Sequence, residues 1–189
     1  MLTNTEGESK IVGDYYLITV RKSAECIVGR SLDRRHKAYL EMVEKLLSWY
    51  IVGLVDGEGC FAVTISNHKT KRLGKDARMI FEIEMRGDER SLLERLQYTW
   101  NCGLIYDLRY PRYGWKPHVK YAIKSHKDIF RVLIPFFKKY PLQGKKRKDF
   151  EDFCRAAEVF RQKRHLTKEG IEELEEIRKF MNRRRPFEE

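Results

Sequence analysis

The architecture of this chain follows from the segment Trp49-Tyr50-Ile51-Val52-Gly53-Leu54-Val55-Asp56-Gly57-Glu58-Gly59-Cys60-Phe61. It starts as the end of an apolar helix, breaks into glycines beside two acidic residues, and continues as a strand. Gly53 and Gly57 are four residues apart, so both fall on one helical face, where a second helix can approach the backbone closely. A carboxylate at the end of such a helix, beside a symmetric partner, gives a two-carboxylate site for divalent metal ions. We therefore expect the chemistry at this segment.

The composition indicates a folded domain with a polyanionic partner. The 189 residues suffice for one domain with a hydrophobic core and room for an appendage. Lysine and arginine number 39 against 28 acidic residues, which gives a net charge of +11. Nucleic acid is the commonest partner of such a chain, although charge alone is also compatible with a basic surface that binds nothing.

The cysteine spacing and the lengths of the apolar runs indicate the cellular compartment in which we expect the protein. Cys26, Cys60, Cys102 and Cys154 form no CxxC pair, which disfavours a structural zinc site or a disulfide framework and favours a reducing compartment. No apolar run reaches membrane-spanning length, and the N-terminus lacks the pattern of a signal peptide, so no membrane partner is expected. The cytoplasm is the default location, with an organelle as the alternative.

Helices are predicted before and after the opening segment. Asp33 is expected to cap a helix that begins near Arg34 and runs without a break into the segment, and Asp88 to cap a short helix further along. Later helices are predicted from Asp128 to Tyr140, with a bend at Pro135, and from about 145 to 163. A last amphipathic helix is expected to start at a Thr167 cap.

The strands have a period of two. Phe61, Val63 and Ile65 alternate with polar residues, and a second strand is predicted for Arg78–Arg86 after a basic loop at Asn67–Asp76. A further strand pair is predicted at 104–110 and 118–124. The predicted fold class is α+β, with the order αββαββα: a curved antiparallel four-stranded sheet with helices on one face and extra C-terminal helices. Its other face is polar and basic and suits a duplex groove.

Three regions are expected from these patterns. Residues 1–32 form an N-terminal extension with residues for a small hairpin, 33–165 form the core, and 166–189 form a C-terminal helix and basic tail.

The glycine-acid segment resembles the signature of the LAGLIDADG homing endonucleases and related maturases, through residues 51–59. The following Cys60-Phe61, the αββαββα order, Leu142-Gln143-Gly144-Lys145-Lys146, and the C-terminal 165–170 with Met181-Asn182 fit the same family. The resemblance covers roughly residues 36 to 183. Only one copy of the motif is present, and single-motif members act as homodimers. The resemblance implies site-specific double-strand cleavage of a long, nearly palindromic DNA site, and a gene carried in an intron.

The family resemblance also implies roles for individual residues. Glu58 matches the acid that binds the divalent metal, Mg²⁺ (or Mn²⁺), and the carbonyl of Gly57 completes the site. Asp56 matches the acid that structures the motif, and Lys146, with Lys145 in the competing register, matches a basic residue near the scissile phosphate. Many members have aspartate in place of Glu58, whose longer side chain shifts the metal geometry. The motif helix and dimer interface comprise Ile51, Gly53, Leu54, Asp56 and Gly57.

Outward-facing residues of the predicted strands and loops are candidates for DNA contacts, with ordinary exposed strand decoration as the alternative for each one singly. They are Thr64, Ser66, His68, Arg78, Glu82, Glu84, Arg109, Arg112, His118, Lys120, Lys124 and Lys145. Because Glu82 and Glu84 repel phosphate, they are expected to contact cytosine amino groups or cations.

Two other functions fit the same scaffold. One is a maturase that binds intron RNA and assists group I splicing without cutting DNA, and the other is a non-catalytic DNA-binding regulator. The intact acid at Glu58 favours cleavage over both. The expected location is the cytoplasm of a bacterium or an organelle, chloroplast or mitochondrion.

Overall fold

The computed structural model describes residues 44–110, 114 and 116–182, and the backbone of three short strands nearer the N-terminus. The helices of the described part are α2 (Ser48–Glu58), α3 (Arg90–Trp100), α4 (His126–Asp128), α5 (Ile134–Lys139), α6 (Lys146–Arg161) and α7 (Lys168–Lys179). The strands are β1 (Ile11–Val12), β2 (Tyr15–Tyr16), β3 (Ile18–Thr19), β4 (Gly59–Asn67), β5 (Lys75–Arg86), β6 (Leu104–Leu108) and β7 (His118–Ile123).

One antiparallel sheet organises the fold, with the strand order β3-β6-β7-β5-β4. Phe61 of β4 pairs with Phe81 of β5, which in turn pairs with Ile123 of β7. Strands β4 to β7 are the predicted four, and the αββαββα order is confirmed. The short β3 adds a fifth strand beside β6, and β1 pairs with β2. The expected division of the chain at 32 and 165 stays a prediction.

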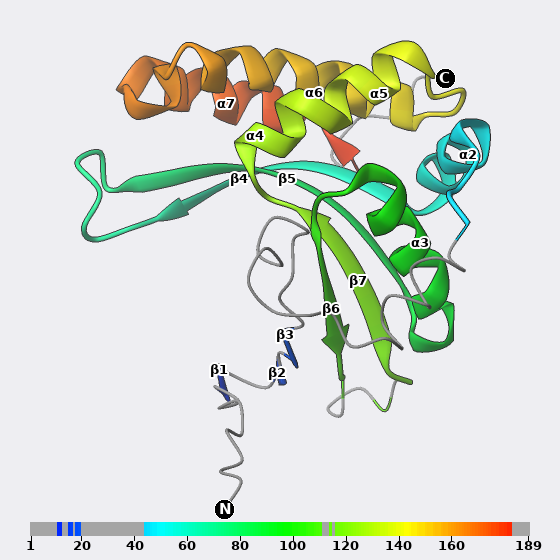
Figure 1. Ribbon diagram of the computed structural model, residues 1–189. Coiled ribbons are helices and arrows are strands. Elements are labelled where there is room, and N and C mark those ends of the chain that lie inside the picture. The colour runs from blue at the N-terminus through cyan, green and yellow to red at the C-terminus, as the bar shows by residue number, and fades with distance from the viewer. Residues whose placement is uncertain are drawn as a thin grey trace, which may run out of the picture.

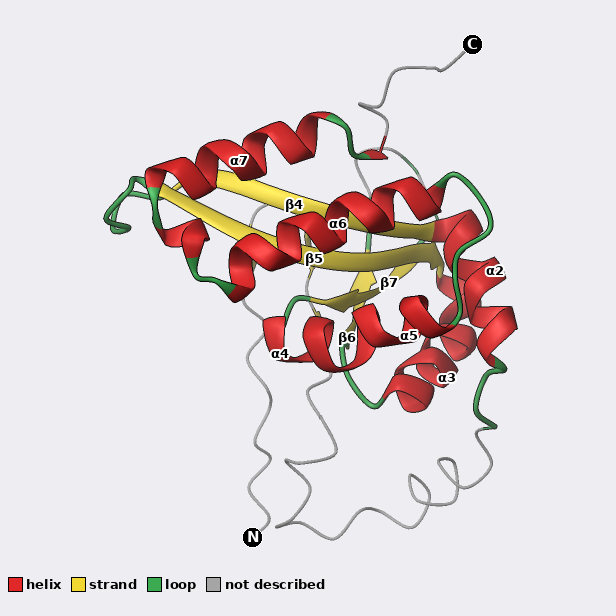
Figure 2. Cartoon of the chain, turned by 90° about the horizontal axis from the view of Figure 1, so that it is seen from above, coloured by secondary structure: helices red, strands yellow, loops and turns green. Residues whose placement is uncertain are grey.

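The described helices cover one face of the curved sheet, and none of them lies on the other face (Figure 1). Seen from above, α6 and α7 lie along β4 and β5, while α3 and α5 lie toward β7 (Figure 2). The cause is alternation: on β5 the side chains of Ala77, Met79, Phe81 and Ile83 are buried, and those between them point the other way. Burying the apolar side of every strand fixes the register, because a slip of one residue would exchange the faces.

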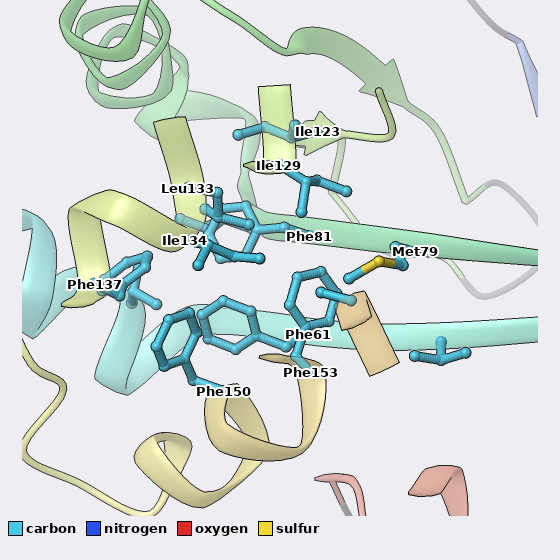
Figure 3. Close-up of a cluster of buried hydrophobic side chains, with 14 of the residues drawn as sticks. Phe61, Met79, Phe81, Ile123, Ile129, Leu133, Ile134, Phe137, Phe150 and Phe153 are labelled. Atoms are coloured by element: carbon cyan, nitrogen blue, oxygen red, sulfur yellow. The ribbon is translucent and has the colours of Figure 1, made fainter. Parts of the chain in front are cut away.

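Aromatic side chains form the centre of the core (Figure 3). The ring of Phe61 is fully buried, with its centroid 5.1 Å from that of Phe81 and 5.4 Å from those of Phe150 and Phe153. These contacts hold α6 against the beginning of β4. The residue directly after the glycine-acid segment is therefore the centre of packing.

Two predicted helix starts are wrong. Residues 44–47 are not helical and α2 begins at Ser48, so no continuous helix runs from Arg34 into the motif; 33–43 lie outside the described residues. Instead, the amide of Leu46 donates to Thr99 Oγ1 at 2.9 Å, and its side chain is buried. Asp88 does not cap α3, because its carboxylate accepts from the guanidinium of Arg86.

The later helices follow the predictions more closely. A π-helical turn, Ile129–Leu133, precedes α5 and widens the backbone just before Pro135, which lacks an amide donor. Thr167 caps α7, because its hydroxyl accepts from the amide of Gly170 at 3.1 Å. The basic loop is shorter than predicted, because β4 and β5 pair as far as Asn67 and Lys75.

Phe61→Ala should lower the free energy of unfolding by about 3–5 kcal/mol, because it leaves a cavity between the sheet and α6. Urea unfolding followed by circular dichroism measures the loss. The matched control is Phe180→Ala, at a side chain that is 48% exposed, for which we expect a loss below about 1 kcal/mol. Equal losses for the two variants would contradict the central role of Phe61.

Candidate active site

The junction between α2 and β4 places Glu58 at the surface. Glu58 is the last residue of α2 and its side chain is exposed, while the next residue, Gly59, is buried. A Cβ at Gly59 would lie 2.6 Å from Cγ1 and 2.7 Å from the carbonyl oxygen of Val55. Only glycine lets the chain turn from helix to strand this tightly, so the glycine fixes where the carboxylate emerges.

The two motif glycines form an open helix face. A Cβ built at Gly53 or Gly57 would meet no heavy atom of the described chain within 4 Å. The opposite side of α2, with Val52 and Val55, is buried in the core. Ile51 belongs to that buried side, with no exposed area, so it lies in the core and not on the predicted interface. Leu54 is half-buried at the edge between the two sides.

Large apolar side chains continue the open side at the start of α2. Leu47 is 79% exposed, Trp49 59% and Tyr50 52%. One edge of Trp49 meets the ring of Tyr140 at 5.6 Å, which leaves most of the indole uncovered. Exposed aromatic groups beside a glycine face are typical of a protein-protein contact surface.

Asp56 connects the motif to the segment before α6. Its carboxylate accepts the amide of Gln143 on Oδ2 at 2.9 Å and that of Gly144 on Oδ1 at 3.1 Å. Both amides precede the first turn of α6, so Asp56 fixes that turn beside the α2–β4 junction. This agrees with the structural role expected for Asp56.

Lys146 is the first residue of α6, the helix that packs against β4. It is half-buried, whereas Lys145 is exposed. Burial is the main reason that the pKa of the Cys60 thiol is raised, Glu82 raises it further, and the charge of Lys146 opposes both. Lys146 is therefore near Cys60, two residues after Glu58. The structure thus brings Glu58 and Lys146 to one region of the sheet edge.

The donor atoms at the junction suit a hard divalent cation. The carboxylate of Glu58 and the carbonyl of Gly57 are oxygen ligands of the kind that Mg²⁺ prefers, and Mg²⁺ usually keeps several waters and binds substrate phosphates as well. Within the described ranges, no group of three or more His, Cys, Asp or Glu side chains is arranged to hold a metal.

An ion-pair network occupies the open face of the sheet. Lys120 Nζ lies 3.0 Å from Glu84 Oε2 and 3.4 Å from Glu82 Oε2. Glu84 Oε1 also accepts from Tyr110 at 2.6 Å and contacts His118 Nδ1 at 3.1 Å. Burial would raise the pKa of Glu84, but the hydrogen bonds from Tyr110, Lys120 and His118 outweigh it and lower that pKa. The two carboxylates thus share one lysine, and Glu84 also has Tyr110 and His118 as partners on the same face.

The other predicted contact residues surround this network. Thr64, Ser66 and Arg78 are exposed, and Thr64 pairs with Arg78 across β4 and β5. His68 lies in the turn beyond β4, and Lys124 lies after β7 with its ammonium 4.9 Å from the ring centre of Tyr106. Arg112 lies outside the described residues.

A hollow of about 450 Å³ lies where β5 and β6 end and β7 begins. Its lining includes the predicted Arg109 and His118, and also Arg86 and Lys116, which the sequence reasoning left out of the site. Alternation along β5 is the signal for Arg86, because it puts this residue on the same face as Glu84. The lining also contains Asp88, which pairs with Arg86, and Asp107, so acidic side chains accompany the basic ones at this end of the sheet.

No helix in the described part of the chain is both long and apolar enough to span a bilayer.

The fold and the junction together define the class of protein. The antiparallel sheet has helices on one face and is entered from a glycine-rich helix that ends in an exposed acid. The sequence of residues 51–157 matches the pattern of the family described as LAGLIDADG endonuclease. The match covers more than half of the chain. The chain belongs to this family.

Individual relatives show the same likeness. "Probable intron-encoded endonuclease 3" of Neurospora crassa is 27% identical over 181 residues, or 92% of this chain and 33% of that protein. The homing endonuclease I-TnaI is 30% identical with a TM-score of 0.67, over 74% of this chain and 90% of that one. I-LtrWI, bound to its target DNA, is 29% identical with a TM-score of 0.70, over 87% of this chain and 57% of that one.

The lengths of the relatives differ from that of this chain. The chain spans a third or less of the curated relatives that it matches, and a little over half of I-LtrWI. I-TnaI, in contrast, is matched over almost its whole length.

Glu84→Gln should flatten the acid side of the stability profile. Because the folded pKa of Glu84 is lowered, its charge contributes stability above the ordinary carboxyl pKa, and this stability is lost as the pH falls through the lowered value. Between about pH 5 and pH 3 the melting temperature of the wild type should therefore fall further than that of the variant. Glu172→Gln, at an exposed position on α7, is the control and should follow the wild type. Parallel profiles for Glu84→Gln and wild type would contradict the network.

Proposed function

We propose that this chain is the subunit of a homodimeric, site-specific DNA endonuclease that cuts both strands of a long, nearly palindromic site with Mg²⁺ or Mn²⁺. One observation carries the proposal: Glu58 is exposed at the end of a helix whose glycine face is open, and Lys146 lies beside the same junction. The polar side chains of β4 and β5 alternate with the buried ones and so lie on the sheet face opposite the core.

Pairing of two α2 helices would complete the site. The open faces at Gly53 and Gly57 allow two helix backbones to approach, and the exposed Trp49 and Tyr50 add apolar area around them. Such a pair brings the two Glu58 carboxylates to the dimer axis. This chain covers 57% of I-LtrWI, so 43% of that chain has no counterpart in a single copy of this one, and a second copy would supply further chain here.

The chemistry assigned to each residue follows from its place. The carboxylate of Glu58 and the carbonyl of Gly57 would hold the divalent ion, which when bound supplies positive charge and activates water for in-line displacement at phosphorus. Lys146 places an ammonium group where the phosphate becomes more negative during the reaction, and so stabilises the transition state. Asp56 keeps Lys146 in reach, because it holds the backbone at Gln143 and Gly144.

The open sheet face would bind the DNA. Thr64, Ser66 and His118 suit hydrogen bonds to base edges, whereas Arg78 and Lys124 add salt-dependent affinity for phosphates. Because Lys120 already pairs with Glu82 and Glu84, these carboxylates repel DNA less than two free carboxylates would. Lys145 and Arg109, both exposed, extend the phosphate contacts at the edges.

The names of the relatives favour cleavage over splicing. The Neurospora relative is called an intron-encoded endonuclease, and the I-LtrWI structure contains its DNA target. The name of the Neurospora relative supports an intron-borne gene. An organelle is the site of action that we propose. Nothing in the described residues favours RNA over DNA, so intron RNA remains a prediction of the resemblance alone.

Glu58→Gln should abolish cleavage while leaving DNA affinity nearly unchanged. The amide keeps the size of the side chain but removes the charge that would hold the metal, so we expect the single-turnover rate in Mg²⁺ to fall at least about 100-fold. The substrate is a duplex enriched by binding from a randomised DNA library, and affinity is measured in EDTA by fluorescence anisotropy. Glu172→Gln is the matched control and should cut like the wild type. Retained cleavage by Glu58→Gln would remove this residue from the mechanism.

Gly53→Leu should convert the dimer to a monomer. The new side chain has room in the isolated chain but blocks the approach of a second helix backbone. Light scattering should give twice the chain mass of 22.7 kDa for the wild type and that mass for the variant. Ser91→Leu, which adds the same side chain at an exposed position on α3, should stay dimeric. A dimeric Gly53→Leu would refute the proposed helix contact.

A further inference from the structure

Asn182 joins the two segments that carry the candidate catalytic side chains. It follows α7 and has a left-handed backbone, with φ of +55°, a conformation that asparagine and glycine tolerate best. Its side-chain Nδ2 donates to the carbonyl oxygen of Phe61 at 2.8 Å, and its backbone amide donates to Asp149 Oδ1 at 2.8 Å. Its Oδ1 lies 3.8 Å from Cys60 Sγ, which completes a set of contacts to two elements.

The two residues that Asn182 contacts each lie three positions after a candidate catalytic residue. Phe61 is three residues after Glu58, at the start of β4, and Asp149 is three residues after Lys146, in the first turn of α6. On a helix, positions three apart share a face, so Asp149 and Lys146 are neighbours on α6. Asn182 therefore spans the separation between the strand that follows Glu58 and the turn that carries Lys146.

The local chemistry explains why a side-chain amide is needed here. β4 is an edge strand of the sheet, so a carbonyl on its outer side, such as that of Phe61, finds no partner strand. Asp149 is only 6% exposed, and a buried carboxylate is costly unless it accepts hydrogen bonds. Asn182 donates to both groups at once, which ties a strand edge to a helix start.

Asp56 holds the same turn of α6 from the other side. It binds the amides of Gln143 and Gly144, whereas Asn182 binds Asp149, so the start of α6 is fixed on both sides of Lys146. A single tie would leave the turn free to pivot about it. With both, the distance between Lys146 and the α2–β4 junction is set.

We propose that Asn182 is a positioning residue of the active site, which holds Lys146 at a fixed separation from Glu58 through Asp149 and the carbonyl of Phe61. The inference rests on the proposed nuclease function. Because small displacements of groups that act on the transition state cost much more rate than affinity, loss of Asn182 should reduce the chemical step selectively.

Asn182→Gly isolates the side-chain contact. Glycine keeps the left-handed backbone and the amide that donates to Asp149, but it loses the hydrogen bond to Phe61. We expect the single-turnover rate in Mg²⁺ on the selected duplex to fall about 10- to 100-fold, with the dissociation constant in EDTA changed less than about threefold. Thr167→Ala is the control, because it removes a cap from the adjoining α7, lowers the melting temperature and should leave the rate unchanged. Equal effects of the two variants on rate would overturn the inference.

A double-mutant cycle with Lys146→Ala tests the route of the effect. If Asn182 acts by placing Lys146, then Asn182→Gly should cost little further rate once the lysine is gone, whereas independent effects would multiply. Multiplying effects would leave Asn182 as a structural residue and refute the proposal. The effect of Asn182→Gly on the single-turnover rate is measured on the same duplex in the wild-type and in the Lys146→Ala background.

A measurement without catalysis separates this inference from the proposed function. Hydrogen exchange of the amides at 146–149 and of the β4 edge should become faster in Asn182→Gly but stay unchanged in Thr167→Ala. If the wild type cuts no enriched duplex, the proposed function fails, and the positioning role fails with it even where exchange becomes faster. If the wild type cuts but exchange at 146–149 is unchanged in Asn182→Gly, only the positioning role fails.

Discussion

The structure depends on the contact between the start of α6 and the junction of α2 with β4. The carboxylate of Asp56 accepts two backbone amides that lie 87 and 88 residues away, and the ring of Phe61 packs against two phenylalanines of α6. A carboxylate is a strong acceptor for orphan backbone amides, and aromatic packing excludes water next to it. Together these contacts bring an exposed acid and a half-buried lysine to one edge of the sheet.

The open face of the sheet carries two carboxylates, and neighbouring side chains on the same face pair with them. Lys120 lies between Glu82 and Glu84, and Tyr110 and His118 supply further hydrogen bonds. The partners lower the pKa of Glu84 although burial alone would raise it. The face is therefore polar near its centre, and basic residues at the hairpin and the strand ends also pair with acids, as Arg78 does with Asp76 and Arg86 with Asp88.

Much of the fold could be predicted because its patterns are local. Alternation on β5 follows from Phe81, Ile83 and Met85, and the cap at Thr167 follows from a hydroxyl three residues before a free amide. The start of α2 could not be predicted in this way, since the apolar residues before Ser48 keep helical spacing. A tertiary contact precedes the start of α2, because the amide of Leu46 donates a hydrogen bond to Thr99. Asp88 likewise pairs with an arginine on the preceding strand and does not cap α3.

By itself the sequence determined the glycine-acid motif, the strand and helix order, and the exposure of Glu58, because these depend on residue type and spacing within about ten positions. Only the tertiary structure decided that Ile51 lies in the core, that Lys146 is half-buried while Lys145 is exposed, and that Asn182 connects β4 to α6. The reason is physical: a periodic pattern fixes which face of an element is buried. Which distant polar groups meet is fixed by the packing of whole elements against each other.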